Sequence, residues 1–135
     1  MKKYWAEFLG TYILVFVGAG AIIINSVTDG LVSHLGIGLT FGLVVMAMIY
    51  AIGDISGAHI NPAVTIAFWV AKRFPANQLL QYISFQLLGA ISASATLHFL
   101  FPDALTMGQT LPLNGNWMQS FFLELILTFI LMFVI

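Results

Sequence analysis

The dipeptide Asn61-Pro62 most limits how this chain can fold, because it interrupts a sequence that is otherwise strongly apolar. It lies in the segment S-G-A-H-I-N-P-A-V, residues 56–64, between two apolar stretches that are too long for a small soluble domain. Asparagine caps helices, and a proline at the first helical position loses no hydrogen bond that it needs. The pair therefore predicts a helix that starts at Pro62.

The predicted helix, Pro62 to Val70, is too short to cross a membrane. At 1.5 Å per residue it covers roughly 14 Å, about half of a hydrocarbon core of ~30 Å. Irregular backbone at membrane depth occurs only where protein buries it or where it lines a water-filled cavity. We therefore predict a re-entrant segment, a loop that enters the membrane and returns as a half-helix. The positive N-terminal end of that helix would lie near the midplane.

The composition places the chain in a membrane. Hydrophobic residues make up 61% of the sequence and charged residues 7%, whereas about 25% of the residues in a soluble domain are charged. The net charge of -1 gives no signal for a nucleic-acid partner, and the absence of cysteine excludes disulfide bonds. The sequence contains no cluster of metal ligands, and we expect no metal or cofactor. The apolar run after Lys2 and Lys3 has the length of a span, which argues against a cleaved signal peptide.

Apolar stretches of spanning length alternate with polar loops. The predicted spans run from about Trp5 to Ile24, Leu35 to Gly53, Gln78 to Leu100, and from Trp117 to Ile135, where the sequence stops inside the span. The predicted loops are Asn25 to His34 and Phe101 to Asn116. The fold class is therefore all-α and transmembrane, with residues 1–135 as a single membrane domain.

Small residues share faces of the predicted spans. On the first span the face consists of Glu7, Gly10, Thr11, Leu14 and Gly18, and on the third of Gln86, Gly89, Ala90 and Ala93. The second span carries the small-xxx-small pattern Gly38 to Gly42. Small residues let membrane helices approach closely, so we expect these faces to point into a bundle. Glu7 could instead be a carboxylate that snorkels to the membrane interface.

The basic residues predict the orientation. They are Lys2, Lys3, Lys72 and Arg73. With a cytoplasmic N-terminus all of them lie inside, as the positive-inside rule prefers. The re-entrant segment then enters from the cytoplasm, at the end of the first span that carries Glu7. We expect Glu7 to accept hydrogen bonds from N–H groups of the loop or from the His59 ring.

The ten residues S-G-A-H-I-N-P-A-V-T resemble the first signature of the aquaporin, or major intrinsic protein, family of channels. Three further segments are similar to that family's supporting segments: A-E-F-L-G-T at 6–11, Q-L-L-G-A at 86–90 and F-L-E-L-I-L-T-F at 122–129. The resemblance covers the whole chain and is nearest to the nodulin-26-like and bacterial branches. It implies an aquaporin-like helical bundle made of the first inverted repeat, which has three spans and one half-helix, and most of a fourth span.

The resemblance also implies a function, a passive pore for water or small uncharged solutes such as glycerol or neutral metalloid acids. In the motif Asn61-Pro62-Ala63, the Asn61 amide would donate to the permeating molecule at mid-pore. The acceptors leading to it would be the carbonyls of Gly57, Ala58 and His59.

Further roles follow from the same resemblance. Phe41 falls at the second-span position of the family's narrow filter. Glu7 and Gln86 would support the re-entrant loop, and Glu124 would support a second such loop. The complete protein would be a multi-pass homotetramer in the inner or plasma membrane.

The sequence departs from the family in one large respect: the fifth and sixth spans, the second Asn-Pro-Ala loop and the filter arginine are absent. An inverted-repeat fold needs both halves to close its pore. We therefore expect residues 1–135 to be an incomplete domain, a fragment of a longer channel that does not conduct by itself.

Other classes of function fit the sequence less well than a channel. A repeat unit of a secondary transporter also has broken helices, usually with an ionisable coupling residue, but the deep carboxylate here is Glu124, far in sequence from the loop. A non-conducting membrane assembly partner is a further alternative. An enzyme needs an oriented nucleophile and base, and no third group orients Ser56 and His59. We therefore predict that the chain is not an enzyme.

Single cysteines test the predicted topology, because the sequence has no native cysteine. An impermeant thiol reagent applied to intact cells should label cysteines at positions 28 and 108. It should not label cysteines at positions 2, 72 and 74, which face the cytoplasm. Labelling of position 72 from outside would contradict both the orientation and the re-entrant segment.

Overall fold

The computed structural model describes residues 1–135, with the exception of the Leu113 side chain. Its elements are α1 (Lys2–Val27), α2 (Ser33–Ser56), α3 (Pro62–Val70), α4 (Ala76–Leu100), the short 3-10 helix η1 (Leu113–Gly115) and α5 (Trp117–Val134). Helices α1, α2, α4 and α5 are long and apolar enough to cross a membrane. The predicted all-α transmembrane class is confirmed, and the half-helix α3 has the predicted bounds.

The C-terminal end of α2 lies beyond the boundary that the sequence predicted. The predicted span ended at Gly53, where the apolar run stops, but the helix continues to Ser56. Polar residues such as Asp54 end an apolar stretch without ending a helix. The helix stops at Gly57, whose left-handed conformation (φ 87°) lets its N–H bond to the Gly53 carbonyl.

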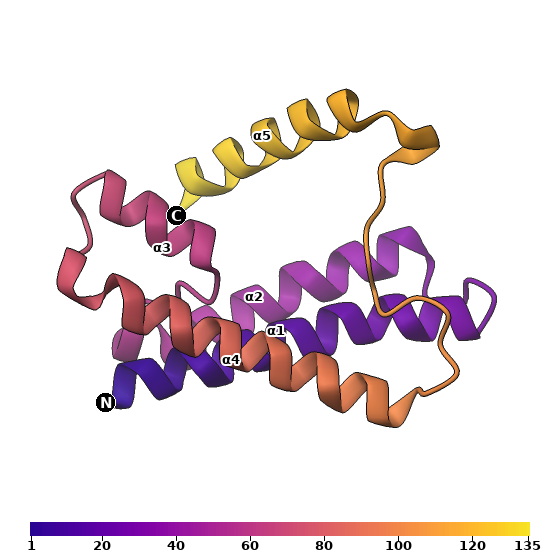
Figure 1. The fold of residues 1–135 in the computed structure, drawn as a ribbon, viewed down its shortest axis with the longest axis horizontal. Coiled ribbons are helices and arrows are strands. Elements are labelled where there is room, and N and C mark those ends of the chain that lie inside the picture. The colour runs from indigo at the N-terminus through magenta and orange to yellow at the C-terminus, as the bar shows by residue number, and fades with distance from the viewer.

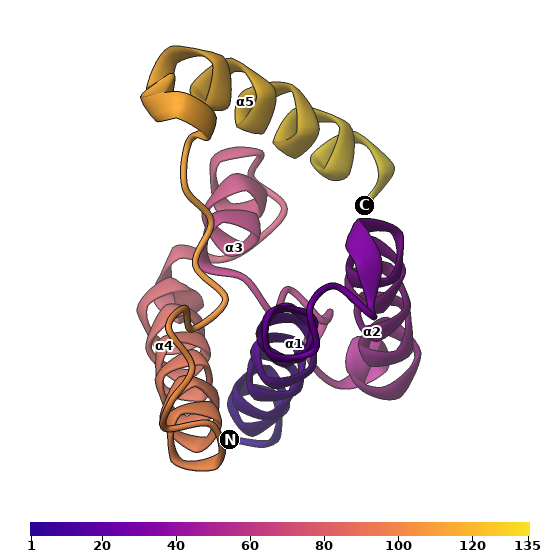
Figure 2. The same cartoon turned by 90° about the vertical axis from the view of Figure 1, so that its right-hand side faces the viewer.

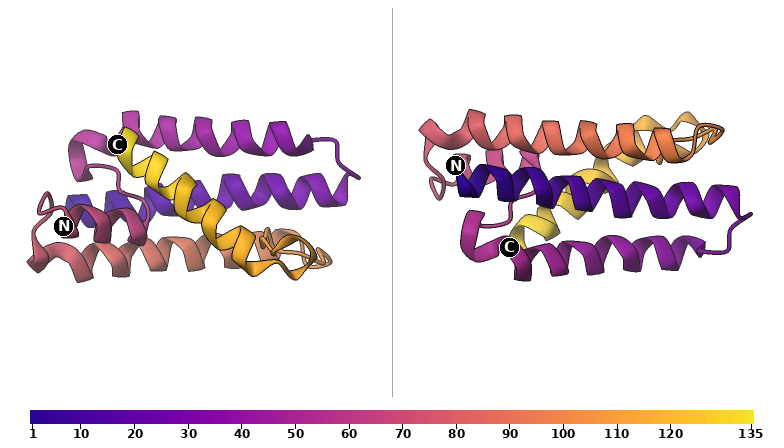
Figure 3. Two further views of the ribbon diagram at one scale, coloured as in Figure 1. Left: turned by 90° about the horizontal axis from the view of Figure 1, so that it is seen from above. Right: turned by 90° about the horizontal axis from the view of Figure 1, so that it is seen from below.

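Helix α1 is the centre of the bundle. It packs against α2 on one side and α4 on the other, and α3 packs against α4. Figure 2 shows this order end-on, with α1 between its two neighbours. The long axes of α1, α2 and α4 run alongside one another, as Figure 1 shows. Helix α5 instead crosses them obliquely (Figure 3) and has no buried residue.

Helices α1 and α4 approach each other closely at Gly89. A Cβ added there would overlap the carbonyl oxygen of Phe8 and lie 3.1 Å from the backbone nitrogen of Tyr12. Glycine is therefore the residue that lets the two backbones approach this closely. At their N-terminal ends, α1 and α4 are joined by a hydrogen bond from Lys3 Nζ to Gln78 Oε1.

The hydrogen bond between Lys3 and Gln78 places the N-terminal ends of α1 and α4 side by side. Lys72 and Arg73 directly precede α4. All of the chain's basic residues therefore lie at one end of the bundle, the arrangement on which the predicted orientation depends.

The small-xxx-small face of α2 does not pack as predicted. Within the described part of the chain, nothing lies within 4 Å of a Cβ added at Gly38 or Gly42. Helix α2 instead contacts the glycines of α1 through Ile52, which packs over Gly10, and through Phe41, which packs against Gly18. A small-residue pattern indicates that a close approach is possible, but it does not specify which neighbour approaches.

The loop before α5 bears on the choice of labelling sites. Gly108 has a φ of 75°, and a Cβ added there would lie 2.8 Å from the Cβ of Ala19. A cysteine at position 108 would therefore be strained. Asp103 lies in the same loop and is exposed, so it is the better position for the outside label.

We expect Gly89→Ala to destabilise the bundle, because the new methyl group would meet the backbone of α1. Overpacking of this kind costs about 1–3 kcal/mol. Gly38→Ala is the matched control, since it adds the same methyl group to a helix where nothing lies within 4 Å. Thermal unfolding in detergent should show a lower Tm for Gly89→Ala alone. Equal Tm values for the two variants would contradict the close approach at Gly89.

Candidate functional site

The loop between α2 and α3 has an unusual backbone. Gly57, Ala58 and Ile60 all have positive φ values, of 87°, 47° and 42°. Glycine tolerates this region, but a β-branched residue such as Ile60 is rarely found there. A non-glycine residue held in such a conformation costs roughly 1–3 kcal/mol. The loop therefore needs contacts from outside itself to keep this shape.

The carboxylate of Glu7 supplies those contacts. Its Oε1 accepts a hydrogen bond from the His59 N–H at 3.0 Å, and its Oε2 accepts one from the Ile60 N–H at 2.7 Å. Oε2 also accepts a hydrogen bond from Gln86 Nε2 at 2.6 Å. Glu7 is fully buried. All of these partners are donors, so an ionised carboxylate, which only accepts, matches them.

Gln86 and Thr65 extend this network to α3 and α4. Gln86 Nε2 lies 2.9 Å from Thr65 Oγ1, and both side chains are fully buried. The Thr65 hydroxyl is also 3.1 Å from the Asn61 carbonyl oxygen and 3.1 Å from His59 Nδ1. The network of Glu7, Gln86 and Thr65 therefore connects α1, α3 and α4 to the loop.

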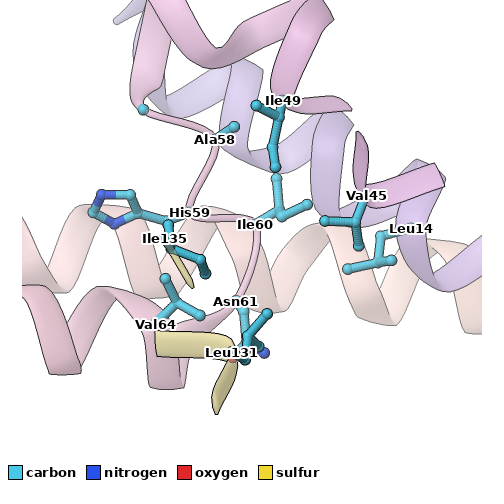
Figure 4. Close-up of a pocket in the computed structure, with 11 residues that line it drawn as sticks. Leu14, Val45, Ile49, Ala58, His59, Ile60, Asn61, Val64, Leu131 and Ile135 are labelled. Carbon is cyan, nitrogen blue, oxygen red and sulfur yellow. The ribbon is translucent and has the colours of Figure 1, made fainter. Parts of the chain in front are cut away.

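A second set of contacts holds the start of the loop and the His59 ring. Ser56 Oγ accepts a hydrogen bond from the Ala58 N–H at 3.1 Å, and the Tyr82 hydroxyl donates to the Ser56 carbonyl at 2.8 Å. The His59 ring packs among aromatic rings, with centroid distances of 4.8 Å to Phe68, 4.9 Å to Phe74 and 5.3 Å to Tyr82. Figure 4 shows the ring directed to the side opposite Leu14 and Val45.

The hydrogen bonds also fix the direction of the loop carbonyls. The loop between α2 and α3 has no cis peptide bond, and in a planar trans peptide the N–H and the preceding C=O point in opposite directions. The N–H groups of His59 and Ile60 point at Glu7. The carbonyls of Ala58 and His59 therefore point away from it. The Gly57 carbonyl likewise points away from the Ser56 side chain, because the Ala58 N–H points toward it.

Asn61 caps α3, as the sequence predicted. Its backbone is extended (φ -154°, ψ 127°), and its Oδ1 accepts a hydrogen bond from the Ala63 N–H at 2.8 Å. Pro62 is the first residue of the helix. Because Oδ1 is turned toward the helix, the Nδ2 donors on the other side of the amide are directed away from it.

A pocket of about 140 Å³ lies beside the loop. Its walls are the loop residues 57–61 together with Leu14, Val45, Ile49, Val64, Leu131 and Ile135 (Figure 4). This volume holds several water molecules. The side chains from the helices are apolar, so the polar groups of the wall come from the loop and Asn61.

Phe41 lies next to this pocket and does not line it. It precedes Val45 by one helical turn on the same face of α2, and its ring lies against Gly18 of α1. Glu124 is not part of the network around Glu7. It is exposed on α5 and borders a separate hollow with Thr110, Leu111, Pro112 and Ser120.

Sequence reasoning did not assign roles to Thr65 and Tyr82. Both carried a usable signal in their spacing. Thr65 follows Asn61 by four residues, which places its hydroxyl one turn above the cap. Tyr82 precedes Gln86 by four residues and shares its buried face.

Together, the fold and the site define a multi-pass membrane protein with a re-entrant segment held by a buried carboxylate. The sequence matches the major intrinsic protein family over residues 1–135, and the chain belongs to that family. The predicted family is therefore confirmed.

Curated relatives cover the whole chain. It is 48% identical to aquaporin NIP1-1 of Zea mays over 136 residues, which are 100% of this chain and 48% of that protein. It is 46% identical to aquaporin NIP1-2 of Arabidopsis thaliana over 143 residues, with the same coverage of 100% and 48%. It is 44% identical to nodulin-26 of Glycine max over 141 residues, 100% of this chain and 50% of that protein. The chain thus spans about half the length of the curated relatives it matches.

We expect Glu7→Gln to destabilise the loop, because the amide replaces one acceptor oxygen with an NH₂ group that faces donors. An unsatisfied buried donor costs about 1–3 kcal/mol. Asp54→Asn is the matched control, since Asp54 is exposed near the end of α2. Thermal unfolding should give a lower Tm for Glu7→Gln than for the wild type or the control. A wild-type Tm in Glu7→Gln would contradict this role and favour the alternative that the Glu7 side chain snorkels to the membrane interface.

Proposed function

We propose that this chain forms one half of the wall of a passive transmembrane pore for water or small uncharged solutes. The observation that carries the proposal is the opposite direction of the N–H and C=O groups of the loop. The N–H groups of His59 and Ile60 bond to Glu7, and the preceding carbonyls are directed away from Glu7. The same loop residues and Asn61 line the pocket. A polar strip on an otherwise apolar wall lets single molecules exchange hydrogen bonds as they pass.

Asn61 would lie at the point of this path where the electrostatic potential opposes cations most strongly. Its side-chain NH₂ group would donate hydrogen bonds to the solute, while its Oδ1 caps the positive N-terminal end of α3. The carbonyls of Gly57, Ala58 and His59 would serve as the acceptors that lead to it. Pro62 and Ala63 fix the start of the half-helix. A cation meets positive potential here, whereas a neutral molecule does not. This is the general account of aquaporin-type pores, which the geometry of this chain fits.

The pore proposed for this chain needs a second half. We infer that residues 1–135 act as a single unit, the first repeat and most of a fourth span of an inverted-repeat channel. The inference is supported by the alignments, in which the chain covers about half the length of each relative. The open faces of α2 and α5 also support it. The complete channel would be a homotetramer in the plasma or inner membrane with a cytoplasmic N-terminus. Glu124 would support the second re-entrant loop.

A secondary transporter fits the geometry less well. Coupling to an ion gradient usually needs an ionisable residue at the substrate site. Glu7 is buried behind the loop, and its oxygens are occupied by N–H donors. Glu124 borders a different hollow from the one that Asn61 lines. Membership of the major intrinsic protein family also agrees with the prediction that the chain is not an enzyme.

The variant Asn61→Asp tests the proposed barrier in the complete channel. A carboxylate at the positive end of α3 would weaken the barrier to cations, so cation leak into liposomes should rise while water flux persists. Asn77→Asp makes the same chemical change at an exposed site on α4 and should not raise the leak. Unchanged cation exclusion in Asn61→Asp, with water flux intact, would mean that Asn61 is only a helix cap. By itself, the 135-residue chain should give the osmotic swelling rate of protein-free vesicles.

A further inference from the structure

Gly18 of α1 lies directly beneath the ring of Phe41 of α2. A Cβ added at Gly18 would overlap Cε1 of that ring and lie 2.5 Å from Cζ and 2.9 Å from Cδ1. Carbon atoms in van der Waals contact are about 3.5–4.0 Å apart. The ring therefore rests on the α1 backbone at a distance that no residue larger than glycine allows. Gly18 itself is buried.

The contact between Gly18 and Phe41 adjoins the pocket on both helices. Phe41 precedes Val45 by one turn of α2, and Gly18 follows Leu14 by one turn of α1. Val45 and Leu14 both line the pocket. The two residues therefore continue its walls by one turn. Phe41 is 36% exposed, so its ring has free space on the side away from α1.

We propose that Gly18 sets the width of the pore at Phe41. This inference rests on the pore function proposed above. Without a side chain at position 18, the ring lies against α1 and is withdrawn from the path. A methyl group there would push the ring away from α1, toward the open side. The path would narrow, and a glycerol-sized solute would lose more flux than water.

A merely structural glycine would behave differently. If Gly18 only let α1 and α2 approach each other, the effect of a methyl group would not depend on the Phe41 ring. If Gly18 acts by positioning the ring, removal of the ring should abolish the effect. A double-mutant cycle between positions 18 and 41 separates these two cases.

The first arm of the experiment uses thermal unfolding of the 135-residue chain in detergent and does not depend on transport. Gly18→Ala should lower the Tm, whereas Gly18→Ala in a Phe41→Ala background should not lower it further. Gly20→Ala is the matched control, because the nearest atom to its added Cβ is Leu97 Cδ2 at 3.4 Å, an ordinary contact. If Gly18→Ala does not fold, recovery of folding in the double variant gives the same answer.

The second arm measures glycerol and water fluxes of the complete channel in liposomes. Gly18→Ala should lower the ratio of glycerol to water flux by about tenfold. This is the lower end of the range by which one methylene group changes discrimination between two substrates. The double variant should show the ratio of Phe41→Ala alone, and Gly20→Ala the ratio of the wild type. A ratio unchanged in Gly18→Ala, or lowered equally in both backgrounds, would overturn the proposal.

The two arms distinguish the failure of this inference from the failure of the pore function. If the complete wild-type channel carries neither water nor glycerol, the pore proposal fails and the width proposal fails with it, whatever the unfolding cycle shows. If the wild type conducts but the cycle shows no coupling between positions 18 and 41, only the width proposal is overturned.

Discussion

The hydrogen bonds from the His59 and Ile60 N–H groups to Glu7 are the interaction on which the rest of this site depends. Ala58 and Ile60 are held at positive φ, which costs roughly 1–3 kcal/mol each. Hydrogen bonds to a charged group contribute about 1.5–3 kcal/mol each. The two magnitudes are comparable, so the hydrogen bonds to the carboxylate can offset the strain of the loop. The direction of the loop carbonyls follows from the same bonds.

The membrane explains why a buried carboxylate is used for this purpose. The hydrocarbon of the bilayer offers no water to backbone groups, so protein must satisfy those that do not face the pocket. A buried charge is costly unless its surroundings supply hydrogen bonds. Here Glu7 receives them from the loop and from Gln86, and Gln86 is fixed in turn by Thr65. Each polar side chain on this side of the loop thus orients the next, and the carbonyls of Ala58 and His59 point away from the network.

Much of this arrangement could be predicted from the sequence, because it depends on local rules. Asn61-Pro62 fixes the start of α3, and the position of Glu7 at the same end as the loop indicated their contact. The packing partners could not be predicted. Gly38 and Gly42 have the pattern of a packing face but no neighbour in the described chain, whereas Gly18 and Gly89 make the close approaches. Spacing along a helix shows which residues share a face, and the three-dimensional arrangement decides what that face meets.

Amide hydrogen exchange in lipid bilayers tests the central claim most directly. The N–H groups of His59 and Ile60 lie outside any helix, in a loop beside a pocket large enough for water. If the Glu7 carboxylate holds them, they should exchange as slowly as the amides in the middle of α1. Rapid exchange of both amides in the wild-type protein, at the rate of the Phe101–Asn116 loop, would contradict the account.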